Sequence, residues 1–272
     1  MSGWRLVARA QPRLRIDARV LQPAALASLS RPEVERVTLR QGRDAVPLAE
    51  LFDVERIEAS TTARLVVEGD LSRFDHLGWC MSEGELQVRG SVGDYAGAAM
   101  AGGRMTISGH AADLAACAMR GGWLEVSGDV GDLAASALPG EMDGMRGGTF
   151  VLRGSAGTRL ADRMRRGCVV VFGDTGDFMA SRMVAGTVAL AGRCGAHPGW
   201  GMRRGSLVFA GFVPEVAPTF TPVHSNADVF WQLLARDLAS FGGPFASLAQ
   251  RRLRRYAGDL AVLGKGELLM PE

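Results

Sequence analysis

The sequence predicts a mainly β protein: a right-handed parallel β-helix of about seven to eight coils, with a small α/β cap at its N-terminal end and a helical cap at its C-terminal end. Three observations predict this fold. A glycine returns every 19 residues, a second glycine follows each one after six residues, and the residues between them alternate apolar and mixed. We expect the N-terminal cap over residues 1–60, the β-helix over 61–211 and the C-terminal cap over 212–272.

Paired glycines mark the coils. Seven glycines open the repeats at spacings of 19 residues, apart from one spacing of 26. The pairs are Gly84 and Gly90, Gly103 and Gly109, Gly122 and Gly128, Gly148 and Gly154, Gly167 and Gly173, Gly186 and Gly192, and Gly205 and Gly211. Glycine at a fixed corner permits positive φ and close approach of neighbouring backbones. We therefore expect both sets to be structural corners of stacked coils.

The residues between paired glycines predict one short strand per coil. The second and fourth residues after each opening glycine are apolar, as Val169 and Val171 are in GCVVVFG. This alternation is typical of a strand with one buried face. Stacking at about 4.8 Å per coil predicts a rod about 35 Å long. Right-handed winding follows from the handedness of parallel crossovers.

An apolar residue ten positions after the second glycine predicts an interior column. Its members are Met100, Met119, Leu138, Met164, Met183 and Met202. Flexible thioethers fill irregular interior space. The 26-residue repeat carries seven surplus residues within 138–148, and either Leu138 or Met145 could fill the interior there. We expect this insert to loop from a corner, where loops often make contacts.

The N-terminal flank predicts a cap, which a β-helix needs at each end. We expect a strand over residues 13–17 and a helix near 23–29. The sequence Ser30-Arg-Pro-Glu33 is a capping signature with proline where helices tolerate it, and it predicts the start of a second helix.

The C-terminal flank opens with a proline-rich crossing, FVPEVAPTFTP. Asn226 is then expected to cap an amphipathic helix over residues 227–241, which Gly242 and Gly243 would end. A second helix is expected over residues 244–258.

Composition excludes several function classes. The 272 residues are 47% hydrophobic and 22% charged, and the net charge of +2 gives no bulk attraction to nucleic acid or membrane. No membrane span or signal peptide is expected, so a cytoplasmic location is the default. The four cysteines lie far apart and suggest neither a disulfide framework nor a zinc site. Arginine supplies 30 of the 31 basic residues, which is typical of a GC-rich bacterial genome.

Motifs for chemistry are weak. GDVGDL and GDTGDF look like phosphate loops, but the same glycines recur in every coil and are better explained as corners. Calcium-binding β-rolls repeat every nine residues, unlike this chain. We therefore expect no metal site and no catalytic residue. His197 stands out because it replaces the Leu or Phe of other coils at its position.

The arginines are more informative. They recur at the coil corners and on neighbouring coils, at Arg163, Arg165, Arg166, Arg182, Arg203 and Arg204. Stacked guanidinium groups repel one another unless something acidic lies along them. One interpretation is a solvated edge neutralised by local Asp162 and Asp177, or a contact between subunits. The other is an edge that binds a polyanion.

The glycine-cornered coils resemble the GXGXG domain at the C-terminus of the glutamate synthase large subunit. The chain also resembles the C subunit of formylmethanofuran dehydrogenase over nearly its whole length. The stretches that carry this resemblance are LPGEMDGMRGG, DRMRRG, SRMVAGTVALAGRCG, GAHPGWGMRRGSL and RRYAGDLAVLGKGELL. The resemblance implies a scaffold without chemistry of its own. In methanogenic archaea the family belongs to the tungsten or molybdenum enzyme. In methylotrophic bacteria it belongs to the formyltransferase/hydrolase complex, which the arginine-rich composition favours.

The bacterial complex, as the resemblance implies, moves a formyl group from tetrahydromethanopterin to a methanofuran-type carrier and hydrolyses it to formate. The implied partners are the amidohydrolase-like A subunit, the B subunit and the formyltransferase D subunit. No cofactor is expected to be held tightly by this chain, but the carrier has a glutamate-rich tail. Guanidinium groups pair with carboxylates bidentately, so the six corner arginines and His197 are the hypothetical contacts of that tail.

Two further interpretations stay open. The chain could be a freestanding glutamate-synthase-type domain that helps ammonia transfer. It could also be a homo-oligomeric binding module without formyl chemistry. Proteins that co-purify with the native chain would separate these interpretations from the complex.

Overall fold

The computed structural model describes residues 2–58, 61–223 and 228–271. As expected, the protein is mainly β. In the described residues, thirteen strands form one mixed sheet and four short strands form a second. No helix in these three ranges is long and apolar enough to cross a membrane.

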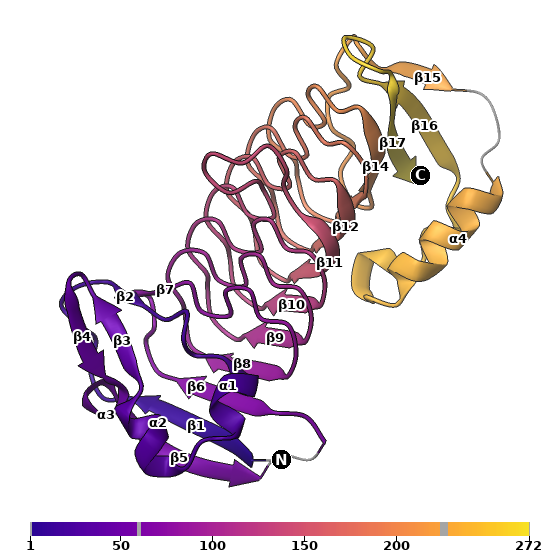
Figure 1. Cartoon of the computed structure of the whole chain (residues 1–272). Coiled ribbons are helices and arrows are strands. Elements are labelled where there is room, and N and C mark those ends of the chain that lie inside the picture. The colour runs from indigo at the N-terminus through magenta and orange to yellow at the C-terminus, as the bar shows by residue number, and fades with distance from the viewer. Residues whose placement is uncertain (1, 59–60, 224–227, 272) are drawn as a thin grey trace.

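One strand of each repeat stacks on the next in parallel. These strands are β6 (Arg64–Glu68), β8 (Glu85–Arg89), β9 (Arg104–Ile107), β10 (Trp123–Val126), β11 (Arg146–Leu152), β12 (Arg166–Val171), β13 (Thr187–Leu190) and β14 (Arg204–Phe209). The register pairs equivalent residues of neighbouring repeats, such as Leu86 with Met105. A second ladder of bridges, from Leu71 to Cys194, joins another part of each repeat. Figure 1 shows the result as a stack of coils.

The interior of the stack is apolar, as the alternation predicts. Val169 and Val171 are both fully buried, and so are their equivalents in the other coils. The predicted methionine column is also fully buried, as Met100 and Met183 illustrate. In the long coil, Met145 is the residue with no exposed surface, whereas Leu138 is only half-buried.

The N-terminal segment extends the stack. Its elements are β1 (Ser2–Ala8), β2 (Ile16–Asp17), α1 (Pro23–Ala27), α2 (Arg31–Arg36), β3 (Thr38–Gln41), β4 (Asp44–Pro47), α3 (Leu48–Leu51), β5 (Phe52–Glu58) and β7 (Phe74–Asp75). Strand β1 pairs in parallel with β6 and antiparallel with β5. Helix α2 carries the predicted capping box, in which the Ser30 backbone N–H donates to Glu33 Oε2 at 2.7 Å.

The strand expected over residues 13–17 is shorter than predicted. Only β2 forms, because Ile16 is buried opposite Phe74 while Leu14 remains 60% exposed. Strand β2 joins the small sheet in the order β4-β3-β2-β7 and lies beside β7, with which it pairs in parallel (Figure 1).

The C-terminal segment corrects one expectation. The prediction of a helix over residues 244–258 is wrong. This stretch contains two 3₁₀ turns, η1 (Gly243–Phe245) and η2 (Leu248–Gln250), and then strand β16 (Leu253–Gly258). Strand β17 (Lys265–Pro271) stacks in parallel on β14, and its free edge supplies hydrogen bonds to β16, which pairs in turn with β15 (Thr221–Val223). The C-terminal cap is therefore mixed rather than helical.

Helix α4 (Asp228–Ala239) forms largely where the amphipathic pattern predicts it. It buries Trp231, Ala235 and Leu238 in a cluster with Val170 and Val208 of the coil strands. The predicted cap Asn226 lies outside the described residues.

Candidate functional site

The corner that precedes each strand carries a dipeptide whose charge changes from coil to coil. The dipeptide is Arg165-Arg166 at the start of β12, Val184-Ala185 shortly before β13 and Arg203-Arg204 at the start of β14. Because the coils stack in a 19-residue register, these dipeptides lie on consecutive coils. The two arginine pairs are thus two coils apart, roughly 10 Å, with a small apolar pair between them.

Two adjoining grooves follow this edge. One, of about 680 Å³, is lined by Asp143, Arg146, Arg165, Arg166, Val184, Ala185, Arg203, Arg204 and Leu263. The other, of about 510 Å³, is lined by Met142, Asp143, Arg163, Arg165, Arg182, Val184, Trp200, Gly201, Arg203, Asp259, Ala261 and Val262. Each of the six arginines selected from the sequence therefore lines at least one of the two grooves, which share Asp143, Arg165, Val184 and Arg203.

The insert of the long coil neutralises part of this edge. Asp143 Oδ1 lies 2.9 Å from Arg165 Nε, and Glu141 Oε2 lies 3.2 Å from Arg146 Nη2. Arg163 Nη1 donates to the backbone carbonyl of Glu141 at 3.2 Å. The insert thus forms one wall of the grooves and is attached to them by its own acidic residues.

Arg182 has a structural partner. Its Nε and Nη2 donate to the two oxygens of Asp162 at 3.0 and 2.6 Å, and the Ser181 hydroxyl donates to Asp162 Oδ1 at 2.5 Å. The Asp162 residue is only 4% exposed, so its charge depends on these contacts. Asp177, the other suggested neutralising group, instead accepts the Ala196 N–H at 2.7 Å.

Arg182→Ala is expected to lower the free energy of unfolding by about 2 kcal/mol, because the buried charge of Asp162 would keep only the Ser181 hydroxyl and the more distant Arg163, whose Nε lies 3.9 Å from Asp162 Oδ2. Urea unfolding of the purified chain measures this change. Arg166→Ala, at an exposed position, serves as the matched control and should change stability by less than about 0.5 kcal/mol. Equal losses in the two variants would contradict the structural role of Arg182.

Three arginines remain available for a ligand. Arg166, Arg203 and Arg204 are exposed, and their side chains make no ion pair or hydrogen bond within the described ranges. Lys265, which is aligned with Arg204 in the β14–β17 ladder, extends the basic edge by one strand. Half-exposed Trp200 completes an edge that can bind a chain of carboxylates or phosphates.

His197 lies elsewhere. It lines neither groove, and its ring centroid is 5.1 Å from that of Phe178. Conversely, sequence reasoning missed Trp200, Val262 and Leu263 as groove residues. Residues 261–263 belong to the connection between β16 and β17. They reach the grooves only because β16 forms a hairpin with β17, where we expected a helix.

Among the described residues, no three His, Cys, Asp or Glu side chains are grouped so that they could hold a metal ion.

Known proteins share both the sequence pattern and the fold. The model of the GXGXG motif matches residues 49–217. The C subunit of the formyltransferase/hydrolase complex Fhc of Methylorubrum extorquens is 52% identical over 54 residues, 20% of each chain. The C subunit of tungsten-containing formylmethanofuran dehydrogenase 2 of Methanothermobacter marburgensis is 31% identical over 97 residues, 35% of this chain and 36% of that one. These aligned segments span between a fifth and about a third of the curated relatives.

A solved structure matches over a much longer range. A chain in the crystal structure of the formyltransferase/hydrolase complex FhcABCD of Methylorubrum extorquens, in complex with methylofuran, superimposes with a TM-score of 0.89. It is 38% identical, and the match covers 98% of this chain and 99% of that chain.

Proposed function

The chain belongs to the GXGXG motif family, and from this premise we propose that it is the C subunit of a formyltransferase/hydrolase complex. Such a complex transfers a formyl group from tetrahydromethanopterin to a methanofuran-type carrier and hydrolyses it to formate. The observation that carries the proposal is the similarity, over nearly its full length, to a chain of a solved formyltransferase/hydrolase complex.

Within this complex the chain acts as a non-catalytic scaffold. Its stacked coils are a right-handed parallel β-helix of about seven to eight coils, with caps over residues 1–60 and 212–272. The long faces of such a rod suit several partners at once. The partners are the amidohydrolase-like A subunit, the B subunit and the formyltransferase D subunit, and the assembly works in the cytoplasm.

The arginine edge holds the glutamate-rich tail of the carrier. Arg166, Arg203 and Arg204 make the main contacts, because their guanidinium groups are exposed and make no ion pair within the described ranges. Arg163, Arg165 and Arg182 line the same grooves but already have partners, and His197 lies beyond them. The tail is bound reversibly, as suits an arm that carries a formyl group between two active sites.

Purification of the native protein through an affinity tag tests the proposal. We expect an amidohydrolase-like protein and a formyltransferase to co-purify in fixed ratio, identified by mass spectrometry. A lone homo-oligomer would reject the complex, and flavin with an amidotransferase would indicate a glutamate-synthase-type partner instead.

One alternative has support of its own, since the chain also resembles the C subunit of a tungsten-containing formylmethanofuran dehydrogenase. Metal analysis of the purified assembly separates the two settings. Tungsten or molybdenum in stoichiometric amount would favour the dehydrogenase, and its absence alongside formyltransferase activity would favour the transferase/hydrolase complex.

A further inference from the structure

A column of residues runs along the outside of the turn in each coil. Its seven members have φ between 58° and 62°: His76, Tyr95, Leu114, Leu133, Arg159, Phe178 and His197. The backbone N–H of each of the first six donates to a carbonyl of the next coil, as Leu114 donates to Asp132 at 2.9 Å. We call these seven residues the outer column.

Most of the outer column is apolar or aromatic. The rings of His76 and Tyr95 stack with centroids 4.8 Å apart, and those of Phe178 and His197 lie 5.1 Å apart. Leu114 and Leu133, between these pairs, are half-buried. Exposed Arg159 separates Leu133 from Phe178 in this column. The two leucines therefore form a short apolar patch beside Tyr95, and an apolar patch rimmed by polar residues is typical of an interaction site.

A ladder of aspartates runs beside the outer column, one residue earlier in each coil. We call Asp75, Asp94, Asp113, Asp132 and Asp177 the acidic ladder. Oδ1 of each accepts the N–H of the equivalent residue in the next coil, at distances from 2.6 to 3.3 Å. The carboxylates are thus held in fixed positions, about 4.8 Å apart where coils are adjacent.

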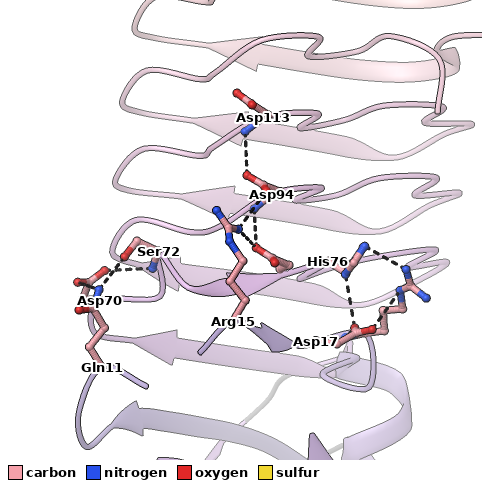
Figure 2. Close-up of polar contacts among 10 residues, drawn as sticks. Gln11, Arg15, Asp17, Asp70, Ser72, His76, Asp94 and Asp113 are labelled. Carbon is pink, nitrogen blue, oxygen red and sulfur yellow. Dashed lines mark hydrogen bonds and ion pairs between the residues drawn. The ribbon is translucent and has the colours of Figure 1, made fainter. Parts of the chain in front are cut away.

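The N-terminal end of the ladder already binds a guanidinium group. Arg15 Nη1 lies 2.5 Å from Asp75 Oδ1 and 3.0 Å from Asp94 Oδ2, so one arginine bridges two consecutive coils. Figure 2 shows Arg15 extended along the ladder toward Asp94, with Asp113 one coil further on.

Arg19 covers the adjoining end of the outer column. Its Nη2 donates to His76 Nε2 at 3.0 Å, and its guanidinium carbon lies 4.6 Å from the centre of the Trp79 ring. An acceptor at Nε2 requires a neutral imidazole. Burial, and then the charge of Arg19, lower the pKa of His76 in agreement with this state. Arg15 and Arg19 of this chain therefore already occupy the N-terminal end of the acidic ladder and of the outer column.

The two following coils present the same surface without an arginine, and Arg159 of the next coil has its guanidinium carbon 5.4 Å from the centre of the Phe178 ring. Asp113 and Asp132 make no ion pair among the described side chains, and they lie beside Leu114 and Leu133. Two carboxylates one coil apart repel each other in the free protein. A cation placed between them would remove this repulsion, as Arg15 does between Asp75 and Asp94.

We propose that the outer column and acidic ladder at Asp113, Leu114, Asp132 and Leu133 are a docking surface for an apolar segment of another subunit that carries an arginine. The proposal rests on the proposed function, since the partner belongs to the same complex. Its guanidinium bridges Asp113 and Asp132, while apolar side chains beside it cover the two leucines. Charge complementarity and the intramolecular example of Arg15 favour a partner segment that combines an arginine with apolar side chains over one that is purely basic or purely apolar.

The double variant Asp113→Asn, Asp132→Asn tests the surface. Asparagine keeps an oxygen at Oδ1, so the N–H contacts of the ladder are retained and only the charge is removed. We expect the dissociation constant between this chain and the remaining subunits to rise at least about tenfold in 50 mM salt, with a weaker dependence on salt. Asp44→Asn, Glu50→Gln removes the same charge from the N-terminal cap and should leave the constant unchanged.

The outcomes separate this proposal from the proposed function. Unfolding curves of the isolated variants establish that the fold is retained. If the double variant assembles with the affinity and salt dependence of the wild type, the docking surface is overturned while the complex stands. If the wild-type chain captures none of the other subunits, both proposals are overturned. Self-association that the double variant abolishes would assign the surface to a second copy and overturn the assignment to a different protein of the complex.

Discussion

Gly192→Ala is expected to lower the free energy of unfolding by about 3 kcal/mol. A Cβ at this corner would lie 2.1 Å from the carbonyl oxygen of Gly173 and 2.4 Å from its carbonyl carbon, in the coil below. Both are backbone atoms fixed by the parallel ladder, so the coils would have to separate locally. Urea unfolding followed by tryptophan fluorescence measures the loss.

Gly140→Ala is the matched control. Gly140 lies in the insert at φ 86°, with no atom within 4 Å of an added Cβ. Gly140→Ala should lower the free energy of unfolding by about 1 to 2 kcal/mol, because alanine disfavours this backbone conformation. If Gly192→Ala is no more destabilising than this control, close packing of the coils does not explain the glycine corners.

The triple variant Arg166→Gln, Arg203→Gln, Arg204→Gln is expected to reduce the carrier retained by the purified complex at least about tenfold, which corresponds to about 1.4 kcal/mol. These three guanidinium groups are exposed and make no ion pair within the described ranges. Each can therefore bind a carboxylate without first breaking an internal contact. Retention is measured by mass spectrometry after washing at moderate salt.

A second triple variant controls for net charge. Arg13→Gln, Arg40→Gln, Arg43→Gln removes three exposed charges from the N-terminal segment, away from the grooves. It should retain the carrier as the wild type does. Equal retention by both triple variants would reject the tail-binding edge and leave the scaffold role untouched.

Local pattern predicted the candidate site only in part. Arginines at equivalent positions of a 19-residue repeat must share an edge once the coils stack, and in the structure they line two adjoining grooves. It could not separate Arg182, which pairs with the buried Asp162, from Arg203 and Arg204, because that difference depends on which side chain turns inward.

The C-terminal segment shows why a local pattern fails. Residues 244–258 contain an apolar and basic spacing that is compatible with a helix. The edge of β17 offers this backbone a ladder of hydrogen bonds, and strand β16 forms there. Tertiary pairing of this kind overrides a weak local preference, and it also brings Val262 and Leu263 to the grooves.

By itself the sequence determined the stacking register, the buried face of each strand and the family resemblance, because a strict repeat forces each coil to bury the same positions. Only the tertiary structure decided that Met145 rather than Leu138 fills the long coil, that Arg182 is paired, and that Asp113 and Asp132 have no cationic partner among the described side chains. These outcomes depend on contacts between residues far apart in the chain, and the spacing of residues along a sequence carries no record of them.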